Sequence, residues 1–151
     1  MMENREQPSF FIRYFGPLIF VLSAFGALLW FFFRAFYLLK QIGTVVVVFD
    51  KGSYYALGVG VGLMAIAFAG VQETWLQKPL TKRSTSIISK LAIAGVVLTF
   101  TVPHILHYAS NSYLKNSGYS VCAEASHQWL FVRNIVYIQP SIECSADIKN
   151  K

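Results

Sequence analysis

Charged residues are scarce in this chain. Asp, Glu, Lys and Arg together make up 13% of its 151 residues, against roughly 25% in ordinary soluble domains. Hydrophobic residues make up 55% and aromatic residues 16% of the chain. The scarcity of charge argues against a soluble domain, and the length fits one domain, so the composition predicts a small membrane protein.

Acidic residues are fewer than basic ones, which leaves a net charge of +6. In a soluble chain this charge would suggest a nucleic-acid partner. Here the basic residues flank apolar runs and do not gather in one segment, which is typical of topology signals in membrane proteins. We therefore expect the lipid bilayer as a partner, and no nucleic acid.

The familiar motifs of catalysis and of cofactor binding are missing. The sequence has no phosphate loop, no paired dinucleotide glycines after a strand, no Cys-x-x-Cys and no His-Glu-x-x-His. His104, His107 and His127 could supply three nitrogen ligands, but histidines at a helix end are typical amphipathic residues, so we expect no metal and no cofactor. Ser126 and His127 stand near Glu124, yet sequence neighbours rarely form a catalytic triad. The chain is therefore not predicted to be an enzyme.

Three long runs contain no charged residue: Phe15–Phe33, Tyr54–Val71 and Leu91–Leu106. The first is too long for a signal-peptide core, and its length matches a hydrocarbon layer of about 30 Å. We predict three transmembrane helices, with a kink or an early stop at Pro103 in the third. Because ion and proton pathways need ionisable residues at membrane depth, a transporter or pump is disfavoured.

Four polar segments surround these runs: a leader (1–14), two connections (34–53 and 72–90) and a tail (107–151). Six basic residues lie on the amino-terminal side of the membrane and four on the other. The first group is Arg5, Arg13, Lys78, Lys82, Arg83 and Lys90, and the second is Arg34, Lys40, Lys51 and Lys115. The positive-inside rule then places the amino terminus in the cytoplasm.

Cysteine occurs twice, and both residues, Cys122 and Cys144, lie in the tail. Disulfides persist in oxidising compartments such as the bacterial periplasm, so the pair favours a periplasmic tail; the alternative is two free thiols in the cytosol. If the cysteines pair, they close a loop of about twenty residues and stabilise the fold by roughly 3 kcal/mol.

Short β-strand signals occur in the first connection and in the tail. Thr44–Phe49 is β-branched and is followed by the turn signal Asp50-Lys51-Gly52; a bent helix is the alternative. In the tail, a helical continuation is expected to end at Gly118. Beyond it, Tyr119–Cys122 and Trp129–Ile138 alternate, the second either as one strand with a polar centre or with a bend at Arg133-Asn134. Since hairpins alone are marginal, we predict a small extracytoplasmic β-sheet built from residues 44–49 and the tail and stapled by the disulfide.

Gly58, Gly62 and Gly70 form a stripe of small residues on the second apolar run. Such stripes let helix backbones approach closely in lipid. The stripe can serve packing within one copy of the chain or a homodimer, and the sequence leaves both open.

Arg133 is the first candidate for a functional contact, because it stands among apolar residues of the tail. It can pair with Glu124 or Glu143 inside the chain, or it can contact a partner. Trp129, Tyr119 and Tyr137 are the other candidates for partner binding, because aromatic residues and arginine dominate binding hot spots. The same three aromatic residues also suit the core of the tail or a membrane-interface belt.

The tail also carries a resemblance to known proteins. Gly118-Tyr119-Ser120-Val121-Cys122, the later Val136-Tyr137 and the final Cys144 resemble the pattern of small enterobacterial inner-membrane proteins of unknown function with three spans. The architecture is similar to that of immunity proteins, which protect bacteria from their own membrane-active or periplasm-active toxins. These resemblances imply a bacterial inner-membrane protein that binds a cognate toxin. The alternative is an accessory subunit of an envelope complex that docks through Gly58 and Gly62.

Overall fold

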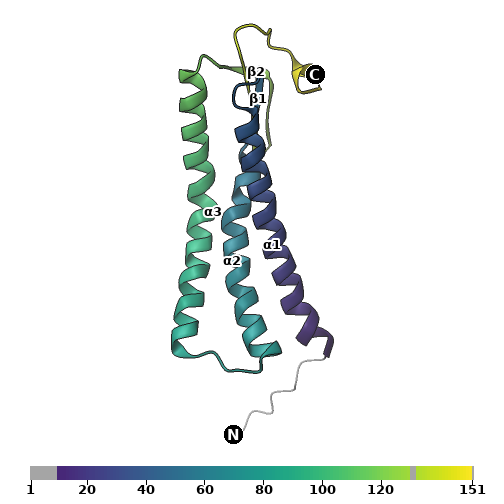
Figure 1. Ribbon diagram of the computed structural model, residues 1–151, viewed down its shortest axis with the longest axis vertical. Coiled ribbons are helices and arrows are strands. Elements are labelled where there is room, and N and C mark those ends of the chain that lie inside the picture. Colours follow the sequence, from purple (N-terminus) through teal and green to yellow (C-terminus); the bar gives the residue numbers. More distant parts are fainter. Residues whose placement is uncertain (1–9, 130–131, 151) are drawn as a thin grey trace.

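The computed structural model describes residues 10–129 and 132–150, so Arg5 and most of the predicted leader lie outside the described residues. Three helices lie side by side, and a small sheet sits at the end of the molecule opposite the amino terminus (Figure 1). The elements in chain order are α1 (Phe10–Gln41), β1 (Val46–Asp50), η1 (Lys51–Tyr54), α2 (Tyr55–Gly70), the π-helical η2 (Val71–Trp75), α3 (Lys82–Asn116), β2 (Ser120–Trp129), β3 (Val132–Ile138) and η3 (Ala146–Asn150).

The three helical segments Arg13–Gln41, Lys51–Trp75 and Lys82–Asn116 are long and apolar enough to cross a membrane. Their outward faces carry large apolar side chains that the rest of the chain leaves uncovered, such as Leu29 and Ile93. Soluble proteins rarely expose apolar patches of this extent, whereas lipid covers them in a multi-pass membrane protein. The predicted three apolar helices are confirmed.

Two of the helices, α1 and α3, extend well beyond the predicted apolar runs. α3 begins at Lys82 and ends at Asn116, which gives it a length of about 52 Å at 1.5 Å per residue. Pro103 lies inside α3 and does not end it, so the predicted early stop is wrong. A proline in a membrane helix removes one backbone hydrogen bond, and packing on neighbouring helices tolerates that loss. The helix ends, as predicted, where Gly118 adopts a positive φ of 86°.

The sheet is antiparallel with strand order β1-β3-β2, so the strand of the first connection pairs with a strand of the tail. The predicted sheet is therefore confirmed, but its hairpin differs from the prediction. Trp129 belongs to β2 and pairs with Val132, the first residue of β3, and Arg133-Asn134 lies within β3. The apolar and polar alternation of Trp129–Ile138 did not indicate the break between β2 and β3. The two residues between these strands lie outside the described ranges, and neither is a glycine, proline or asparagine that would signal a turn.

Ser126 stabilises an irregularity in β2. The register shifts between Cys122 and His127, which lie opposite Val136 and Asn134. Within this bulge the Ser126 hydroxyl donates to the Cys122 carbonyl at 2.6 Å and accepts from the Val136 N–H at 3.1 Å. The side chain thus replaces backbone partners that the extra residues of a bulge displace.

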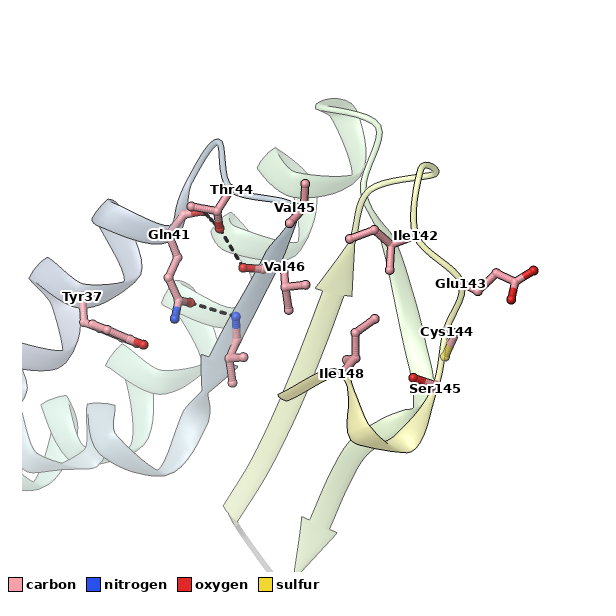
Figure 2. A pocket seen from close by; sticks show the side chains of 11 residues that line it. Tyr37, Gln41, Thr44, Val45, Val46, Ile142, Glu143, Cys144, Ser145 and Ile148 are labelled. Carbon is pink, nitrogen blue, oxygen red and sulfur yellow. Dashed lines mark hydrogen bonds between the residues drawn. The ribbon is translucent and has the colours of Figure 1, made fainter. Parts of the chain in front are cut away.

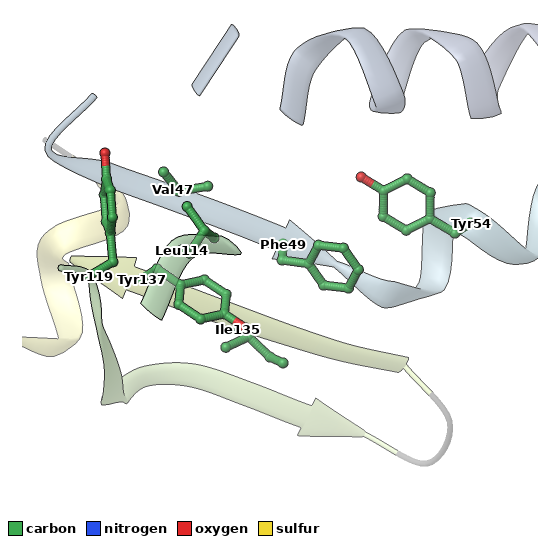
Figure 3. Packing of buried hydrophobic residues seen from close by; sticks show 7 residues of the cluster. All are labelled: Val47, Phe49, Tyr54, Leu114, Tyr119, Ile135 and Tyr137. Carbon is green, nitrogen blue, oxygen red and sulfur yellow. The ribbon is translucent and has the colours of Figure 1, made fainter. Parts of the chain in front are cut away.

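The inner face of the sheet packs against α1 and α3. Figure 3 shows Val47 and Phe49 of β1 beside Ile135 and Tyr137 of β3, on the same face. The cluster is completed by Tyr54, Leu114 and Tyr119, with Phe31, Ala35, Leu38 and Leu106 packed against it. The predicted strand 44–49 thus supplies part of the core that holds the tail on the helices.

The outer face of the sheet is covered by the C-terminal segment, residues 139–150. Cys122, Val136 and Ile138 pack there against Ile148 and Ile142 of that segment. The predicted disulfide between Cys122 and Cys144 is present, with Cα atoms 5.4 Å apart. The second half of β3 is therefore buried on both faces of the sheet, and the disulfide attaches the segment that covers the outer face.

The glycine stripe faces α3 of the same chain. A Cβ atom added at Gly58 would meet the backbone of Thr99 and Gly95, and one added at Gly95 would lie 2.6 Å from the Gly62 nitrogen. Gly70 lies beside Pro17 of α1 instead. Gly58 and Gly62 therefore serve contact within the chain, and no pattern in the sequence marks Gly95 as their partner.

Candidate functional site

A polar network fixes the first connection on α1. Arg34 donates from one terminal nitrogen to Asp50 Oδ2 at 2.9 Å and from Nε to Ser53 Oγ at 3.1 Å, and Ser53 donates to Asp50 Oδ2 at 2.5 Å. Trp30 Nε1 also donates to Ser53 Oγ at 3.3 Å. Asp50 Oδ1 accepts from the Gly52 N–H at 3.0 Å and so caps η1. The network therefore determines where β1 ends and α2 begins.

Sequence reasoning did not find this network, although two signals were present. Arg34 is the first charge after the first apolar run, and Asp50 is the only acidic residue between Glu6 and Glu73. Opposite charges that flank two adjacent spans on one side of a membrane are candidates for an ion pair. That rule would have joined Arg34 to Asp50.

Asp50→Asn is expected to lower the free energy of unfolding by about 2 kcal/mol, because it leaves the half-buried Arg34 guanidinium without its carboxylate. The measurement is denaturant unfolding of the purified chain in detergent micelles. Asp147→Asn removes an exposed carboxylate from the C-terminal segment and is the matched control. Equal stability of the two variants would show that the pair contributes nothing.

A cavity of about 620 Å³ lies between the end of α1, strand β1 and the C-terminal segment (Figure 2). We call it the tail cavity. Its walls carry Tyr37 and Gln41 from α1, valines from β1, and Ile142, Cys144 and Ile148 from the C-terminal segment. Thr44, Glu143 and Ser145 add polar groups to these walls. Residues far apart in the sequence thus form one concave surface of mixed polarity, a shape that suits ligand and partner binding.

The free edge of β1 beside the tail cavity is already occupied. The Val48 N–H donates to Gln41 Oε1 at 2.8 Å, and the Thr44 hydroxyl donates to the Val46 carbonyl at 2.8 Å (Figure 2). These side chains form hydrogen bonds with backbone groups at the edge of β1, and an additional strand would have to pair with the same groups. Recognition at this cavity is therefore expected to use side-chain contacts.

Two of the predicted binding residues belong to the core. Tyr119 is only 7% exposed, and its hydroxyl donates to the Thr44 carbonyl at 2.7 Å. Tyr137 is fully buried, and its hydroxyl donates to Asn111 Oδ1 at 3.2 Å. Burial raises the pKa of Tyr137 above its usual range, and the charge of Arg133 opposes that rise in part. Both tyrosines hold the sheet on its surroundings and present no binding surface.

The other two predicted binding residues lie at the exposed end of the hairpin. Trp129 is 68% exposed, and Arg133 is exposed on the neighbouring strand. Among the described residues, which include Arg133, Glu124 and Glu143, the salt bridge found is that of Arg34 with Asp50. Of the two alternatives for Arg133, the ion pair with Glu124 or Glu143 is therefore not formed, and the contact with a partner stays a prediction. In β3 its neighbour Asn134 pairs with Asp50 of β1, so Arg133 lies beside the start of α2, away from Glu143.

The family model described as "Protein of unknown function (DUF1240)" matches residues 44–144. The chain belongs to this family. The DUF1240 match begins just before β1 and ends at Cys144, so it includes every strand, both cysteines, α2 and α3. No curated protein and no solved structure matches the chain. The family carries no assigned activity, so the geometry has to support any function proposed for the chain.

The histidines of this DUF1240 chain do not gather at one site: His104 and His107 are neighbours on α3, and His127 lies on β2. His107 packs against the Phe49 ring with centroids 5.6 Å apart, and His104 is exposed. In the part of the chain that the structure describes, no group of three His, Cys, Asp or Glu residues could hold a metal ion. Ser126 is engaged in the bulge of β2, as described above.

Proposed function

We propose that the chain is a bacterial inner-membrane immunity protein that binds and neutralises a cognate membrane-active or periplasm-active toxin. The observation that supports this function best is the tail cavity, a concave surface with apolar and polar walls at the sheet end of the molecule. Neutralising a toxin requires a specific surface at the membrane and no catalytic groups. A disulfide-held cavity next to three apolar helices supplies such a surface.

The proposed topology places the amino terminus in the cytoplasm and the sheet in the periplasm. Arg13 Nε donates to the Thr74 carbonyl at 3.1 Å, so the start of α1 lies beside the end of α2. Between Arg13 and Arg34, α1 is about 32 Å long, close to the thickness of a hydrocarbon core of about 30 Å. The bilayer would then lie between these arginines, and the disulfide would lie in an oxidising compartment.

The alternative function, an accessory subunit of an envelope complex, requires the glycine stripe to contact another membrane protein. Gly58 is in contact with α3 of the same chain. A homodimer or a partner helix would have to displace α3 from this contact. The tail cavity is therefore the surface that we assign to the protein partner.

The function predicts a toxin gene beside the gene of this chain, and it is tested by co-expressing the chain with that toxin and counting surviving cells. Survival with the chain, and killing without it, is the expected result. Killing that is unchanged by the chain would refute the immunity function. The chain must be shown in the membrane fraction in each case.

Tyr37→Ala is expected to weaken toxin binding by about 30-fold, because it removes the aromatic wall of the tail cavity and hot-spot truncations cost about 2 kcal/mol or more. Tyr37 is 47% exposed on α1. Tyr108→Ala is the matched control, since Tyr108 is 77% exposed on α3 and does not line the cavity. The measurement is toxin binding by the purified variants, together with survival. If Tyr108→Ala weakens binding as much as Tyr37→Ala, the cavity is not the binding surface.

A further inference from the structure

A second cavity, of about 630 Å³, lies at the other end of the sheet. We call it the basic cavity. The hairpin lines it with Gln128 and Arg133, η1 with Lys51, the start of α2 with Tyr55, and α3 with Phe100 and His104. It therefore combines hydrogen-bond donors and positive charge with aromatic rings.

The positive charge of the basic cavity is not balanced by a neighbouring acid. Its lining among the described residues includes no Asp or Glu. Asp50 precedes Lys51, but its carboxylate accepts from Arg34, Ser53 and the Gly52 N–H. Lys51 and Arg133 are therefore available to an anionic ligand, and the planar guanidinium is well suited to phosphate oxygens.

The basic cavity lies where the apolar span of α2 begins. Lys51 and Tyr55 are at the amino-terminal end of this span, and the tight contact of Gly58 with Thr99 follows one turn later. In a membrane protein, headgroups lie at this boundary, where basic and aromatic side chains are enriched. The position thus favours a ligand that is itself part of the bilayer.

The face of α3 below the cavity offers a path for acyl chains. Ile93, Val96, Val97 and Phe100 recur at helical spacing and are all exposed, Phe100 by 65%. His104 continues this face into the basic cavity one turn beyond Phe100. A bare phosphate ion would leave this apolar strip unused, whereas a phospholipid would cover both parts.

We propose that the basic cavity binds the phosphoryl headgroup of an anionic phospholipid. Lys51 and Arg133 neutralise the headgroup, Tyr55 and Gln128 donate hydrogen bonds to it, and an acyl chain follows the exposed face of α3 from Phe100 towards Ile93. The bound lipid connects the hairpin to α2 and α3. This site is separate from the tail cavity, so it does not depend on the proposed toxin binding.

The test is lipid binding to the purified full chain in a neutral detergent, followed by native mass spectrometry. Phosphatidylglycerol, phosphatidylcholine and inorganic phosphate are the ligands. Lys51→Gln combined with Arg133→Gln is expected to weaken phosphatidylglycerol binding at least about tenfold, because each basic residue near a membrane surface contributes about 1 kcal/mol to binding of anionic lipid. Lys40→Gln combined with Lys115→Gln removes the same charge from exposed positions outside the cavity and is expected to bind like the parent chain.

Four further results decide the proposal. Arg133→Lys, which keeps the charge, is expected to retain most of the binding, and its circular dichroism spectrum checks the fold. Equal affinity for phosphatidylcholine and phosphatidylglycerol would overturn the headgroup assignment. Inorganic phosphate that binds as tightly as the lipid would overturn the assignment of the α3 face. Parent-like binding by the Lys51 and Arg133 double variant would overturn the site itself.

Discussion

Replacing Cys122 and Cys144 together by serine is expected to lower the free energy of unfolding by about 3 kcal/mol, because the cross-link closes a loop of 22 residues. The local effect is larger than this number suggests. Cys122 packs in the outer-face cluster with Val136 and Ile138, and Cys144 lines the tail cavity. Without the bond, the C-terminal segment keeps only a few apolar contacts on the sheet, so one wall of the cavity is lost.

The double serine variant is therefore also expected to lose protection against the toxin while it remains in the membrane. Unfolding in detergent micelles measures the stability, and survival on co-expression measures the function. Reductant is expected to bring the parent chain down to the stability of the variant and to leave the variant unchanged. A variant that is as stable as the parent, and equally protective, would show that the segment holds its place without the cross-link.

The three long apolar helices could be predicted because a segment that is able to cross lipid must meet a simple requirement on its sequence. A segment in the hydrocarbon layer cannot carry unpaired charge, so the absence of charge from Phe15 to Phe33 was a direct signal. The strand at Val46–Asp50 was also predictable, because a β-branched run bounded by a turn has few other stable conformations in water. The disulfide followed from two cysteines in one segment.

The site could not be predicted, because long-range packing determines it. The helical continuation before Gly118 was predicted, but the sequence did not indicate that Leu114 of this continuation packs under the sheet in one cluster with Val47 and Phe49. For the same reason the sequence left Tyr119 and Tyr137 open between partner binding and the core: their hydroxyls find partners, Thr44 and Asn111, that only the fold brings near. Both cavities likewise join segments whose proximity depends on the register of β1 against β3.

Gly58→Ala is expected to destabilise the helix bundle by up to about 3 kcal/mol, although it adds a single methyl group. The new Cβ would overlap the backbone of Thr99 and lie 2.5 Å from the Gly95 carbonyl oxygen. Backbone atoms of a long helix cannot turn aside as a flexible side chain can. Relief therefore requires α2 and α3 to separate, which also weakens contacts along the rest of their interface.

Gly62→Ala is the matched control, four residues further along the same stripe. A Cβ atom at Gly62 would have no atom within 4 Å, so this variant is expected to be as stable as the parent, or more stable by up to about 1 kcal/mol. The measurement is unfolding in mixed micelles as a denaturing detergent is added. If both variants are equally destabilised, a second copy of the chain covers the open side of Gly62. If both are neutral, the contact of α2 with α3 is looser than Gly58 and Gly95 indicate.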